Sequence, residues 1–436
     1  MRDLAEQIFL AGVERVLPDR LIAQQIKRDG DQLQIAGSSY PLSRFRRVYL
    51  LAAGKAAALM ARETERIMGE IITDGHVVTK YGHGCNLQRL TLTEAGHPLP
   101  DAAGVRGTGR LLALACQAGR DDLVLCLISG GASSLMADLP EGATLEELKQ
   151  ANDLLVKSGA DISEINTVRK HLSGVKGGQL AAAAAPATVI SLILSDVIGD
   201  PPGVIASGPT APDSSTFADA LAVIRKYQLE ELFPSPLFDH LQRGVAALIP
   251  ETPKPGDPLF MNVHNHIIGS NRLALEGAAS KAGELGFETH LITDSLQGDY
   301  TAAAGFILRT IGHHSKMEQG KPLCLLFGGE PTLKVSGSGL GGRNQHLALY
   351  LATHFEGRSA ITLLCAGTDG SDGPTDAAGA VVDNRTLTDA EERHIDAFDH
   401  LSRFDSYHFF QQAGGAIITG NTRTNVMDMV VVLCHS

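Results

Sequence analysis

Short, almost uninterrupted apolar runs that alternate with helix-like stretches constrain the fold of this chain most strongly. In the first half of the sequence, the runs lie at residues 47–53, 75–79, 123–128 and 188–194. Such runs are typical of parallel strands that are buried on both faces of a sheet. Stretches with apolar residues at helical spacing lie before or between them, at residues 4–28, 56–68, 103–118, 144–158 and 164–184. The alternation predicts an α/β fold, with a doubly wound and mostly parallel (Rossmann-like) sheet in the N-terminal part.

A proline-rich segment follows this part. Four prolines fall within the nine residues 250–258, and neither a helix interior nor a central strand accepts them. A chain of 436 residues also exceeds what one hydrophobic core usually serves. We therefore expect an N-terminal domain at 1–249, a linker at 250–262 and a smaller C-terminal α/β domain at 263–436. Strands of the second domain are predicted at 265–269, 288–293, 323–327, 332–335, 361–365 and 428–433.

Composition excludes several classes of protein. The net charge is −12, and no basic stripe is present that could displace counterions from nucleic acid. No apolar run reaches the roughly 18 residues of a membrane span, and the N-terminus lacks the apolar region of a signal peptide. The six cysteines form no C-x-x-C pair, and Cys126, Cys324 and Cys365 lie in apolar runs where buried, reduced thiols are expected. These features fit a cytoplasmic protein that binds neither nucleic acid nor membrane, and they are compatible with a homodimer.

Lys55 follows the strand at 47–53 almost directly and stands at the start of a predicted helix. A cation in the first turn of a helix opposes the helix dipole. A bound phosphate or carboxylate would neutralise the ammonium group. Alternatively, the side chain simply extends into solvent.

The loop Ser129-Gly-Gly-Ala-Ser-Ser134 follows another strand in the same way. Its backbone amides and the hydroxyls of Ser129, Ser133 and Ser134 are suited to nucleotide phosphates. Gly130 and Gly131 would allow the phosphates a close approach. A tight turn with capping serines is the alternative.

The stretch 327–345 combines a Gly-rich loop, one arginine and the start of a helix, directly after an apolar strand. Loops of this kind bring backbone N–H groups close to an anion, and Arg343 supplies a bidentate fork for phosphate or carboxylate. Residues 337–342 also match the dinucleotide fingerprint G-x-G-x-x-G. We discount a dinucleotide site, because Arg343 follows at once and the next strand ends in Cys365-Ala-Gly rather than in an acidic residue.

Two acidic positions follow strands. Asp196 stands after the run 188–194, where open α/β sheets bind ligands. It is a candidate general base for a hydroxyl proton or a Mg²⁺ ligand through water, and an Asx turn is the alternative. The loop 366–376 carries Asp369 and two further aspartates, which either position Mg²⁺ and phosphate or cap the next helix. Asn421, in the last polar loop, could hydrogen-bond a hydroxyacid or close its own turn.

The predicted helix at 164–184 carries a charged face beside its buried stripe. Arg169 and Lys176 lie two turns apart on that face. Solvation is the simpler interpretation for Lys170 and Lys176. His171, next to the stripe, is expected to be a satisfied interior histidine.

Taken together, these segments resemble the glycerate 2-kinase family, which is also described by its C-terminal MOFRL region. The resemblance extends over almost the whole chain. It rests on Ala53-Gly-Lys55-Ala, Gly96-His-Pro-Leu-Pro-Asp101, Ser129-Gly-Gly-Ala-Ser-Ser134, Asn166-Thr-Val-Arg-Lys-His-Leu-Ser173, Lys176-Gly-Gly178, Ser195-Asp-Val-Ile-Gly-Asp200, Ser207-Gly-Pro-Thr210, Gly328-Gly-Glu-Pro-Thr332, Gly341-Gly-Arg-Asn-Gln345, Ala366-Gly-Thr-Asp-Gly370 and Thr419-Gly-Asn421. One departure is Asn421, where many relatives are expected to carry a proline.

The resemblance implies an ATP- and Mg²⁺-dependent phosphotransferase with an alcohol acceptor, which converts D-glycerate into 2-phosphoglycerate in a cleft between two α/β domains. Lys55 and Arg343 match the family's catalytic basic residues, and Asp196 is the expected base. Nucleotide-binding residues are expected in the loop 129–134 and at Gly328, Gly329, Glu330, Thr368 and Asp369. The expected substrate-binding residues are Lys55, Arg169, Arg343 and Asn421. The candidate Mg²⁺ ligands, through water or phosphate, are Asp196 and Asp369.

Two other functions compete with this interpretation. An NAD(P)H-dependent reductase of hydroxypyruvate needs a nicotinamide site, and its only fingerprint is the discounted one at 337–342. A carboxylate-binding protein without catalysis predicts ligand binding without turnover.

Overall fold

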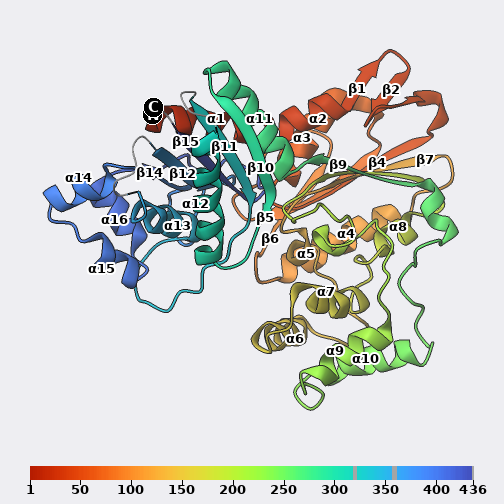
Figure 1. The fold of residues 1–436 in the computed structure, drawn as a ribbon. Coiled ribbons are helices and arrows are strands. Elements are labelled where there is room, and N and C mark those ends of the chain that lie inside the picture. The colour runs from red at the N-terminus through yellow and green to blue at the C-terminus, as the bar shows by residue number, and fades with distance from the viewer. Residues whose placement is uncertain (318–321, 356–360, 435–436) are drawn as a thin grey trace. The chain divides into compact units, whose positions relative to one another are not determined.

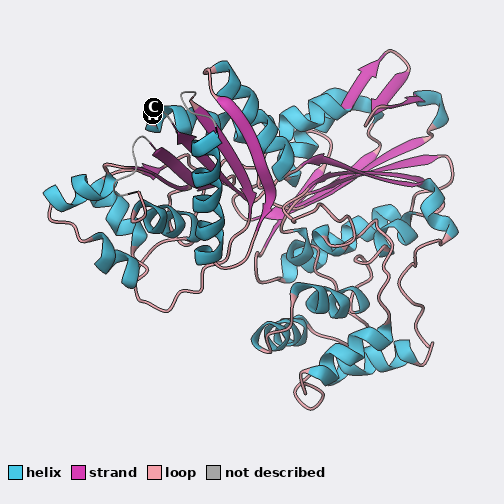
Figure 2. Ribbon diagram, in the orientation of Figure 1, coloured by secondary structure: helices cyan, strands magenta, loops and turns pink. Residues whose placement is uncertain are grey.

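The computed structural model describes residues 1–317, 322–355 and 361–434, and the chain divides into two compact units. Unit 1 consists of Met1–Leu17, Asp196–Gly199 and Gly269–Ser436, and unit 2 consists of Pro18–Ser195 and Asp200–Ile268. This division differs from the predicted one at 250–262. Each unit contains a sheet covered by helices (Figures 1 and 2), so the predicted α/β class is confirmed.

Unit 2 is built around a six-stranded sheet with the strand order β6-β5-β4-β7-β8-β9. Its strands are β4 (Arg47–Ala53), β5 (Asp74–Lys80), β6 (Thr91–Ala95), β7 (Asp122–Ile128), β8 (Thr188–Leu194) and β9 (Val263–Gly269). The neighbouring pairs from β6 to β8 are parallel. Every residue of β7 and β8 is buried, which explains their continuous apolar sequences. The order is that of a doubly wound fold, in which the winding reverses between β4 and β7.

Helices cover both faces of this sheet. Figure 1 shows α3 (Ala57–Met68) and α4 (Ala102–Ala115) on opposite sides of it, and both contact the central strands. A separate apolar core joins four helices farther from the sheet, α6 (Leu145–Lys157), α7 (Ile162–His171), α9 (Phe217–Lys226) and α10 (Ser235–Val245). The remaining elements of unit 2 are α2 (Pro18–Gln25), α5 (Ala132–Leu135), α8 (Gln179–Ala184) and a small antiparallel sheet of β1 (Ile26–Asp29), β2 (Gln32–Ile35) and β3 (Ser38–Pro41).

The proline-rich segment is part of unit 2 and not a linker between units. The amide of Asp213 donates to the carbonyl of Pro253 over 2.9 Å. Thr252 is buried, and its hydroxyl donates to the Asp213 carboxylate over 3.1 Å. Prolines exclude helix and central strand, but they do not prevent a segment from packing against its own domain. The strand β9 that follows completes the first sheet instead of opening the second domain.

Two predicted helices are broken in the structure. The stretch 4–28 forms α1 (Arg2–Arg15) in unit 1, then α2, which begins at Pro18, and finally β1. The stretch 164–184 forms α7 and α8, because Gly177 and Gly178 between them adopt φ values of +57° and +84°. Such values are incompatible with a continuous right-handed helix.

Unit 1 contains a mixed six-stranded sheet with the order β10-β11-β15-β12-β13-β14. Its strands are β10 (Glu288–Leu296), β11 (Leu323–Gly329), β12 (Ile361–Gly367), β13 (Gly379–Asp383), β14 (Ala416–Ile417) and β15 (Asp428–Cys434). β10 and β11 are parallel, whereas the other neighbouring pairs are antiparallel. The predicted strand at 332–335 is wrong, since Thr332 forms only an isolated bridge with Asp299.

Alternate residues of β15 face two different layers of helices. Val430 and Val432 pack in one core with α12 (Tyr300–Met317) and α13 (Arg343–Ala352). Met429 contacts α1 on the other side, where α1 packs along α11 (Asn271–Glu284). Three short helices complete unit 1, namely α14 (Thr386–Glu392), α15 (Ala397–Ser402) and α16 (Ser406–Ala413).

Candidate active-site residues and family membership

The strands β4 and β7 end side by side, at the point where the winding of the sheet in unit 2 reverses. Ala53 is paired with Ile128, and these are the last residues of the two strands. In open α/β sheets, ligands bind outside the carboxyl ends of the strands at this point. Lys55 and the loop 129–134 follow the two strands there, so the fold brings these two predicted site segments together.

Hydrogen bonds join the two segments directly. The amide of Lys55 donates to the carbonyl of Gly130, and the amide of Ala56 donates to Ser129 Oγ, each over 3.0 Å. Gly54 approaches so closely, at φ +129°, that a Cβ in its place would overlap Ser129 Oγ. Ser129 therefore fixes the turn that presents Lys55. This role corresponds to the tight turn that was the alternative interpretation of the loop.

The Lys55 side chain lies beside His97. A Cβ on Gly131 would lie 3.0 Å from His97 Nε2 and 3.1 Å from Lys55 Cγ. Burial and, to a lesser extent, the charge of Lys55 together lower the pKa of His97 to about 4. Within the described residues, the ammonium of Lys55 has neither an ion pair nor a hydrogen bond. A cation beside a neutral imidazole, without an acidic partner, is suited to receive an anion.

The two later serines of the loop contact a second motif. Ser133 Oγ lies 2.9 Å from Ser207 Oγ, and the Ser207 hydroxyl donates to Asn166 Oδ1 over 3.1 Å. Ser134 Oγ donates to the carbonyl of Gly131 over 3.2 Å. Asn166 and Ser207 belong to motifs that carried the family resemblance, but no role was predicted for them. Both are buried, so they support the loop from behind.

Arg169 lies in unit 2 as well, on the inner side of α7. Its Nε donates to Asn152 Oδ1 of α6 over 2.7 Å. Together with Ser133 and Ser134 it lines a cavity of about 360 Å³. The structure therefore places Arg169 next to the predicted phosphate loop.

The prediction that Lys170 and Lys176 are solvated is wrong. Lys176 is buried, donates to the carbonyl of Met136 over 2.6 Å and lies 3.6 Å from Asp138. Lys170 forms an ion pair of 3.2 Å with the buried carboxylate of Asp213. The two lysines instead anchor α7 and the glycine segment after it.

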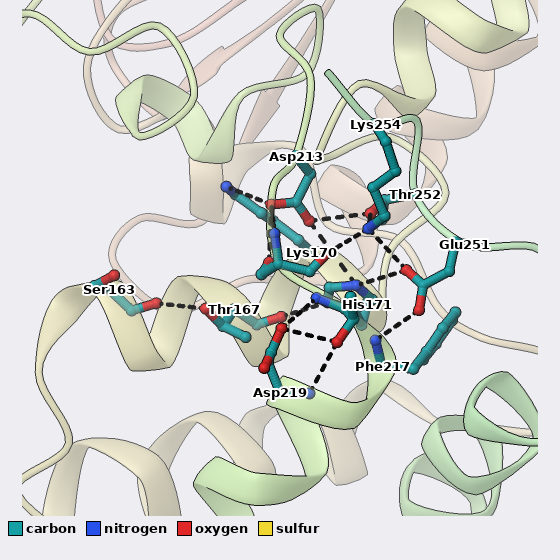
Figure 3. A network of polar contacts seen from close by, with 12 residues as sticks. Ser163, Thr167, Lys170, His171, Asp213, Phe217, Asp219, Glu251, Thr252 and Lys254 are labelled. Carbon is teal, nitrogen blue, oxygen red and sulfur yellow. Dashed lines mark hydrogen bonds and ion pairs between the residues drawn. The ribbon is translucent and has the colours of Figure 1, made fainter. Parts of the chain in front are cut away.

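His171 is a satisfied interior histidine, as predicted. Its Nδ1 lies 2.8 Å from the carbonyl of Thr167, and its Nε2 lies 3.3 Å from Glu251. Figure 3 shows His171 and Lys170 pointing into a polar network with Asp213 and Glu251. This network fixes the C-terminal end of α7, where the ring of His171 also packs against Phe217 of the apolar core.

Unit 1 carries the second basic residue at the end of its sheet. The last residues of β11 and β12, Gly329 and Gly367, are both paired with Asp428, the first residue of β15. Arg343 binds Asp428 through Nε (2.6 Å) and Nη2 (3.0 Å), and its Nη1 lies 2.9 Å from Glu330. Burial opposes the charge of Arg343, but the hydrogen bonds to Asp428 and the charges of Asp428 and Glu330 raise its pKa overall. Among the described residues, Asp428 and Glu330 thus engage three of the five guanidinium donors, and two are left for a ligand.

A buried carboxylate holds the helix that presents Arg343. Asp372 accepts hydrogen bonds from the backbone amides of Asn344 (3.0 Å) and Gln345 (2.8 Å), in the first turn of α13. Burial and, to a lesser extent, the charge of Asp428 raise the pKa of Asp372 to about 6, although the hydrogen bonds from the two amides oppose this shift. Asp372 therefore caps the N-terminus of α13, although it belongs to a loop that is distant in the sequence.

Several residues predicted to bind nucleotide, metal or substrate lie in turns of unit 1. Asp369 Oδ1 accepts from the amide (3.0 Å) and hydroxyl (3.2 Å) of Ser371. The hydroxyl of Thr368 donates to the carbonyl of Met427 over 2.6 Å, and Asn421 Oδ1 accepts from the amide of Arg423 over 2.8 Å. For Asn421, the contact agrees with the alternative that it closes its own turn. Asp369 also closes a turn instead of capping the next helix, and its Oδ2 has no hydrogen bond within the described part of the chain.

The glycines at the end of β11 and in the fingerprint-like stretch are required by packing. A Cβ at Gly328 would overlap Asn271 Oδ1, and one at Gly329 would overlap the backbone of Leu296. Gly337 and Gly339 of the fingerprint-like stretch approach Arg403 and Asp405 in the same way. The glycines of the G-x-G-x-x-G match therefore allow close contact with a neighbouring loop. This contact explains the glycines without a dinucleotide.

Of the predicted catalytic residues, Lys55 lies in unit 2, whereas Arg343 and Asp196 lie in unit 1. Asp196 begins the short segment Asp196–Gly199, which follows β8 but belongs to unit 1. Asp369 is in unit 1 too. In the described ranges, no three His, Cys, Asp or Glu side chains are grouped as for a metal ion. None of the described helices is long and apolar enough to cross a membrane.

Sequence reasoning assigned no role to His97, Asp372 and Asp428. A signal existed for His97 and Asp428, because His97 belongs to a motif of the resemblance and Asp428 is an acidic residue that opens an apolar run. Asp372 was counted among the acids of its loop. Its contact with the start of α13 depends on the tertiary fold.

Residues 4–242 match a family described as a domain of unknown function (DUF4147), and residues 323–428 match the MOFRL family. The chain is 42% identical to the D-glycerate 2-kinase of Thermotoga maritima, over 99% of this chain and 98% of that relative. It is 39% identical to the glycerate 2-kinase of Pyrococcus horikoshii, over 100% of this chain and 98% of that relative. A crystal structure of glycerate kinase from Thermotoga maritima superposes with a TM-score of 0.87 at 41% identity, covering 99% of both chains. The chain therefore belongs to the glycerate 2-kinase family.

Proposed function

We propose that the protein transfers the γ-phosphoryl group of ATP to the 2-hydroxyl of D-glycerate, giving 2-phosphoglycerate and ADP. The observation that carries this proposal is the similarity, over nearly the full length, to relatives named D-glycerate 2-kinase and glycerate 2-kinase. The arrangement of basic residues and loops supports it. A compartment that supplies ATP and keeps thiols reduced, such as the cytoplasm, fits the free cysteines.

Phosphoryl transfer requires mainly positioning and neutralisation of charge. In this proposal, the unpaired ammonium of Lys55 neutralises the transferring phosphoryl group. The two remaining donors of Arg343 bind the phosphoryl group or the carboxylate of glycerate. Asp196 takes the proton of the 2-hydroxyl as the new P–O bond forms, and ADP leaves with the electron pair of the broken P–O bond.

The residues present fit a Mg²⁺ ion only as part of a nucleotide complex. Mg²⁺ is usually held by one or two carboxylates, by phosphate oxygens and by water. Asp369 retains one oxygen without a hydrogen bond, and Asp196 is the second candidate ligand. Asp428, by contrast, is neutralised by Arg343. When bound with ATP, Mg²⁺ would neutralise phosphate charge.

The direct test is ³¹P NMR of the purified protein with D-glycerate, ATP and Mg²⁺. The proposal expects a 2-phosphoglycerate signal that grows together with ADP. A 3-phosphoglycerate signal would retain the reaction class but contradict the position of transfer. No transfer, with loss of NADH in a parallel sample containing hydroxypyruvate, would favour the reductase.

The role of Lys55 can be tested with Lys55→Ala. We expect kcat to fall by about 10²–10³-fold, since one preorganised charge at the reacting group is lost. The unfolding temperature should stay close to that of the wild type, because the ammonium forms no contact within the described residues. Lys27→Ala, which removes an exposed lysine of the same unit, is the control. Near-normal kcat of the Lys55 variant would remove Lys55 from the mechanism.

A further inference from the structure

The cavity beside α6 and α7 is largely apolar and lies entirely in unit 2. Its volume is about 360 Å³, within the range of sites for small molecules. Leu99, Leu148, Val156 and Leu172 form much of its wall. Leu99 and Val156 remain 70% and 59% exposed, although both are large apolar side chains. An unfilled apolar wall of this kind is expected to be covered by a ligand with apolar surface.

The charged groups of the cavity are unequally compensated. Three cations and two carboxylates line it. Most have an oppositely charged partner, namely Lys176 with Asp138, Lys149 with Glu146, and Asp153 with Lys157. Arg169 is the exception, because among the described residues its guanidinium forms no ion pair and donates only to Asn152. Burial accordingly lowers the pKa of Arg169. A partly buried, uncompensated guanidinium is suited to an anionic group of a ligand.

The cavity continues into the loop at the reversal point of the sheet. Ser133 and Ser134 belong to both the cavity wall and this loop. Gly131, three residues before Ser134, lies against Lys55. An elongated ligand could therefore place an apolar part in the cavity and an anionic chain along the loop toward Lys55. Nucleotides have this combination of an apolar base and a charged chain.

We propose that this cavity binds the nucleoside part of the phosphoryl donor, with Arg169 holding its phosphate chain. The inference rests on the proposed function and assigns the donor, rather than the acceptor, to Arg169. D-Glycerate carries a hydroxyl or carboxylate on every carbon, so it has no surface that matches the apolar wall. In this assignment, the basic residues at the reacting centre bind the carboxylate of glycerate.

Binding of ADP to the protein, measured by calorimetry, tests the inference without turnover. Leu99→Asp should weaken ADP binding at least about tenfold, because it places a charged group on the apolar wall that the base is proposed to cover. Leu248→Asp is the matched control, since Leu248 is also 70% exposed in unit 2 but does not line the cavity. Arg169→Gln, which retains a donor for Asn152, should weaken ADP binding about tenfold or more, as for the loss of a charged hydrogen bond.

Steady-state kinetics then separates donor from acceptor. The two cavity variants should raise KM for ATP in parallel with the Kd for ADP and leave KM for glycerate unchanged. Unchanged ADP affinity in both variants, or a wild type that binds no ADP, would overturn the inference. A rise confined to KM for glycerate in Arg169→Gln would assign the residue to the acceptor instead. The protein could also bind ADP, lose affinity in both variants and yet phosphorylate no glycerate. That outcome would support this nucleotide site and contradict the proposed function.

Discussion

At the scale of single residues, Arg343 has a structural task besides the proposed catalytic one. It binds the carboxylate of Asp428, whose side chain is only 3% exposed. Removing one partner of such a pair leaves a buried charge without compensation, which costs more than the pair itself contributes. The same guanidinium still offers two donors to a ligand. The effects of mutating Arg343 on activity and on folding should therefore be measured separately.

Arg343→Ala is expected to lower both activity and stability. The free energy of unfolding should fall by about 1–3 kcal/mol, because Asp428 stays buried without its donors. The value of kcat should fall by about 10²-fold or more. Thermal unfolding and steady-state kinetics measure the two effects. The double variant Arg343→Ala/Asp428→Ala should recover stability but not activity, and an Arg343→Ala protein as stable as the wild type would contradict the structural task.

Asp372 should make stability depend on pH. Its pKa is raised to about 6 in the folded protein, above the value of about 3.9 in an unfolded chain. Between these values the native state binds more protons than the unfolded state, so stability is highest at low pH and decreases as pH rises through this window. The shift corresponds to about 3 kcal/mol. In Asp372→Asn, the midpoint of thermal unfolding should no longer show this decrease between pH 4 and 6. Equal slopes of midpoint against pH for the variant and the wild type would contradict the assignment.

At the scale of elements, the turn from β4 to α3 depends on one glycine. Gly54 has φ +129° and no room for a Cβ against Ser129, whereas Gly69 at the end of α3 also has a positive φ but open space around it. Gly54→Ala should therefore cost about 1–3 kcal/mol more than Gly69→Ala, because overpacking is added to the backbone strain. It should also reduce kcat by displacing Lys55. Urea unfolding and activity assays of the two variants compare these effects, and equal stabilities would argue against the close contact.

How well a strand could be predicted followed the length of its apolar run. β4 and β8 have the predicted bounds, because strands buried on both faces are continuous apolar runs. β6 and β13 were missed, since each is a five-residue strand with a mixed sequence. α12 was missed although it is 18 residues long. The exposed segment 332–335 was overpredicted, because its alternation of apolar and polar residues is not accompanied by a partner strand.

The site was predictable only in its local parts. Lys55 and the loop 129–134 follow strands that are easy to recognise, and the strand order brings them together. The pair of Arg343 and Asp428 spans 85 positions, and that of Asn344 and Asp372 spans 28. No periodicity in a sequence reports such contacts, because they depend on which strand ends meet in the sheet. For the same reason, the burial of Lys176 and the ion pair of Lys170 with Asp213 were not foreseen.

At the scale of the whole molecule, the chain passes from one unit to the other four times, after Leu17, Ser195, Gly199 and Ile268. The first residues of the sequence thereby become part of the unit made by the last ones. Arg2 forms a bidentate pair with Asp383, and Thr424 donates to the carbonyl of Val16 over 2.7 Å. A fragment cut at the proline-rich segment would lack this helix, and we expect residues 263–436 alone not to fold.

The contribution of α1 can be measured in the intact chain. Phe9→Ala should destabilise unit 1 by about 3–5 kcal/mol, because Phe9 is fully buried. Leu10→Ala, at a side chain that is 40% exposed, should change stability by no more than about 0.5 kcal/mol. Hydrogen exchange followed by mass spectrometry should show faster exchange in peptides of unit 1 and unchanged exchange in those of unit 2. Equal acceleration in both units would show that they unfold together.

The placement of α1 also has a consequence for how the protein is made. On the ribosome, α1 emerges long before its partners, because the strands and helices that cover Ile8, Phe9 and Val13 come from residues synthesised after position 268. Unit 2 can fold while the chain is still growing, since its last strand ends at Gly269. The apolar face of α1 therefore remains without its partners until more than 250 further residues have been made. Growing chains are expected to present this face to chaperones until the strands and helices of the later part of unit 1 have emerged.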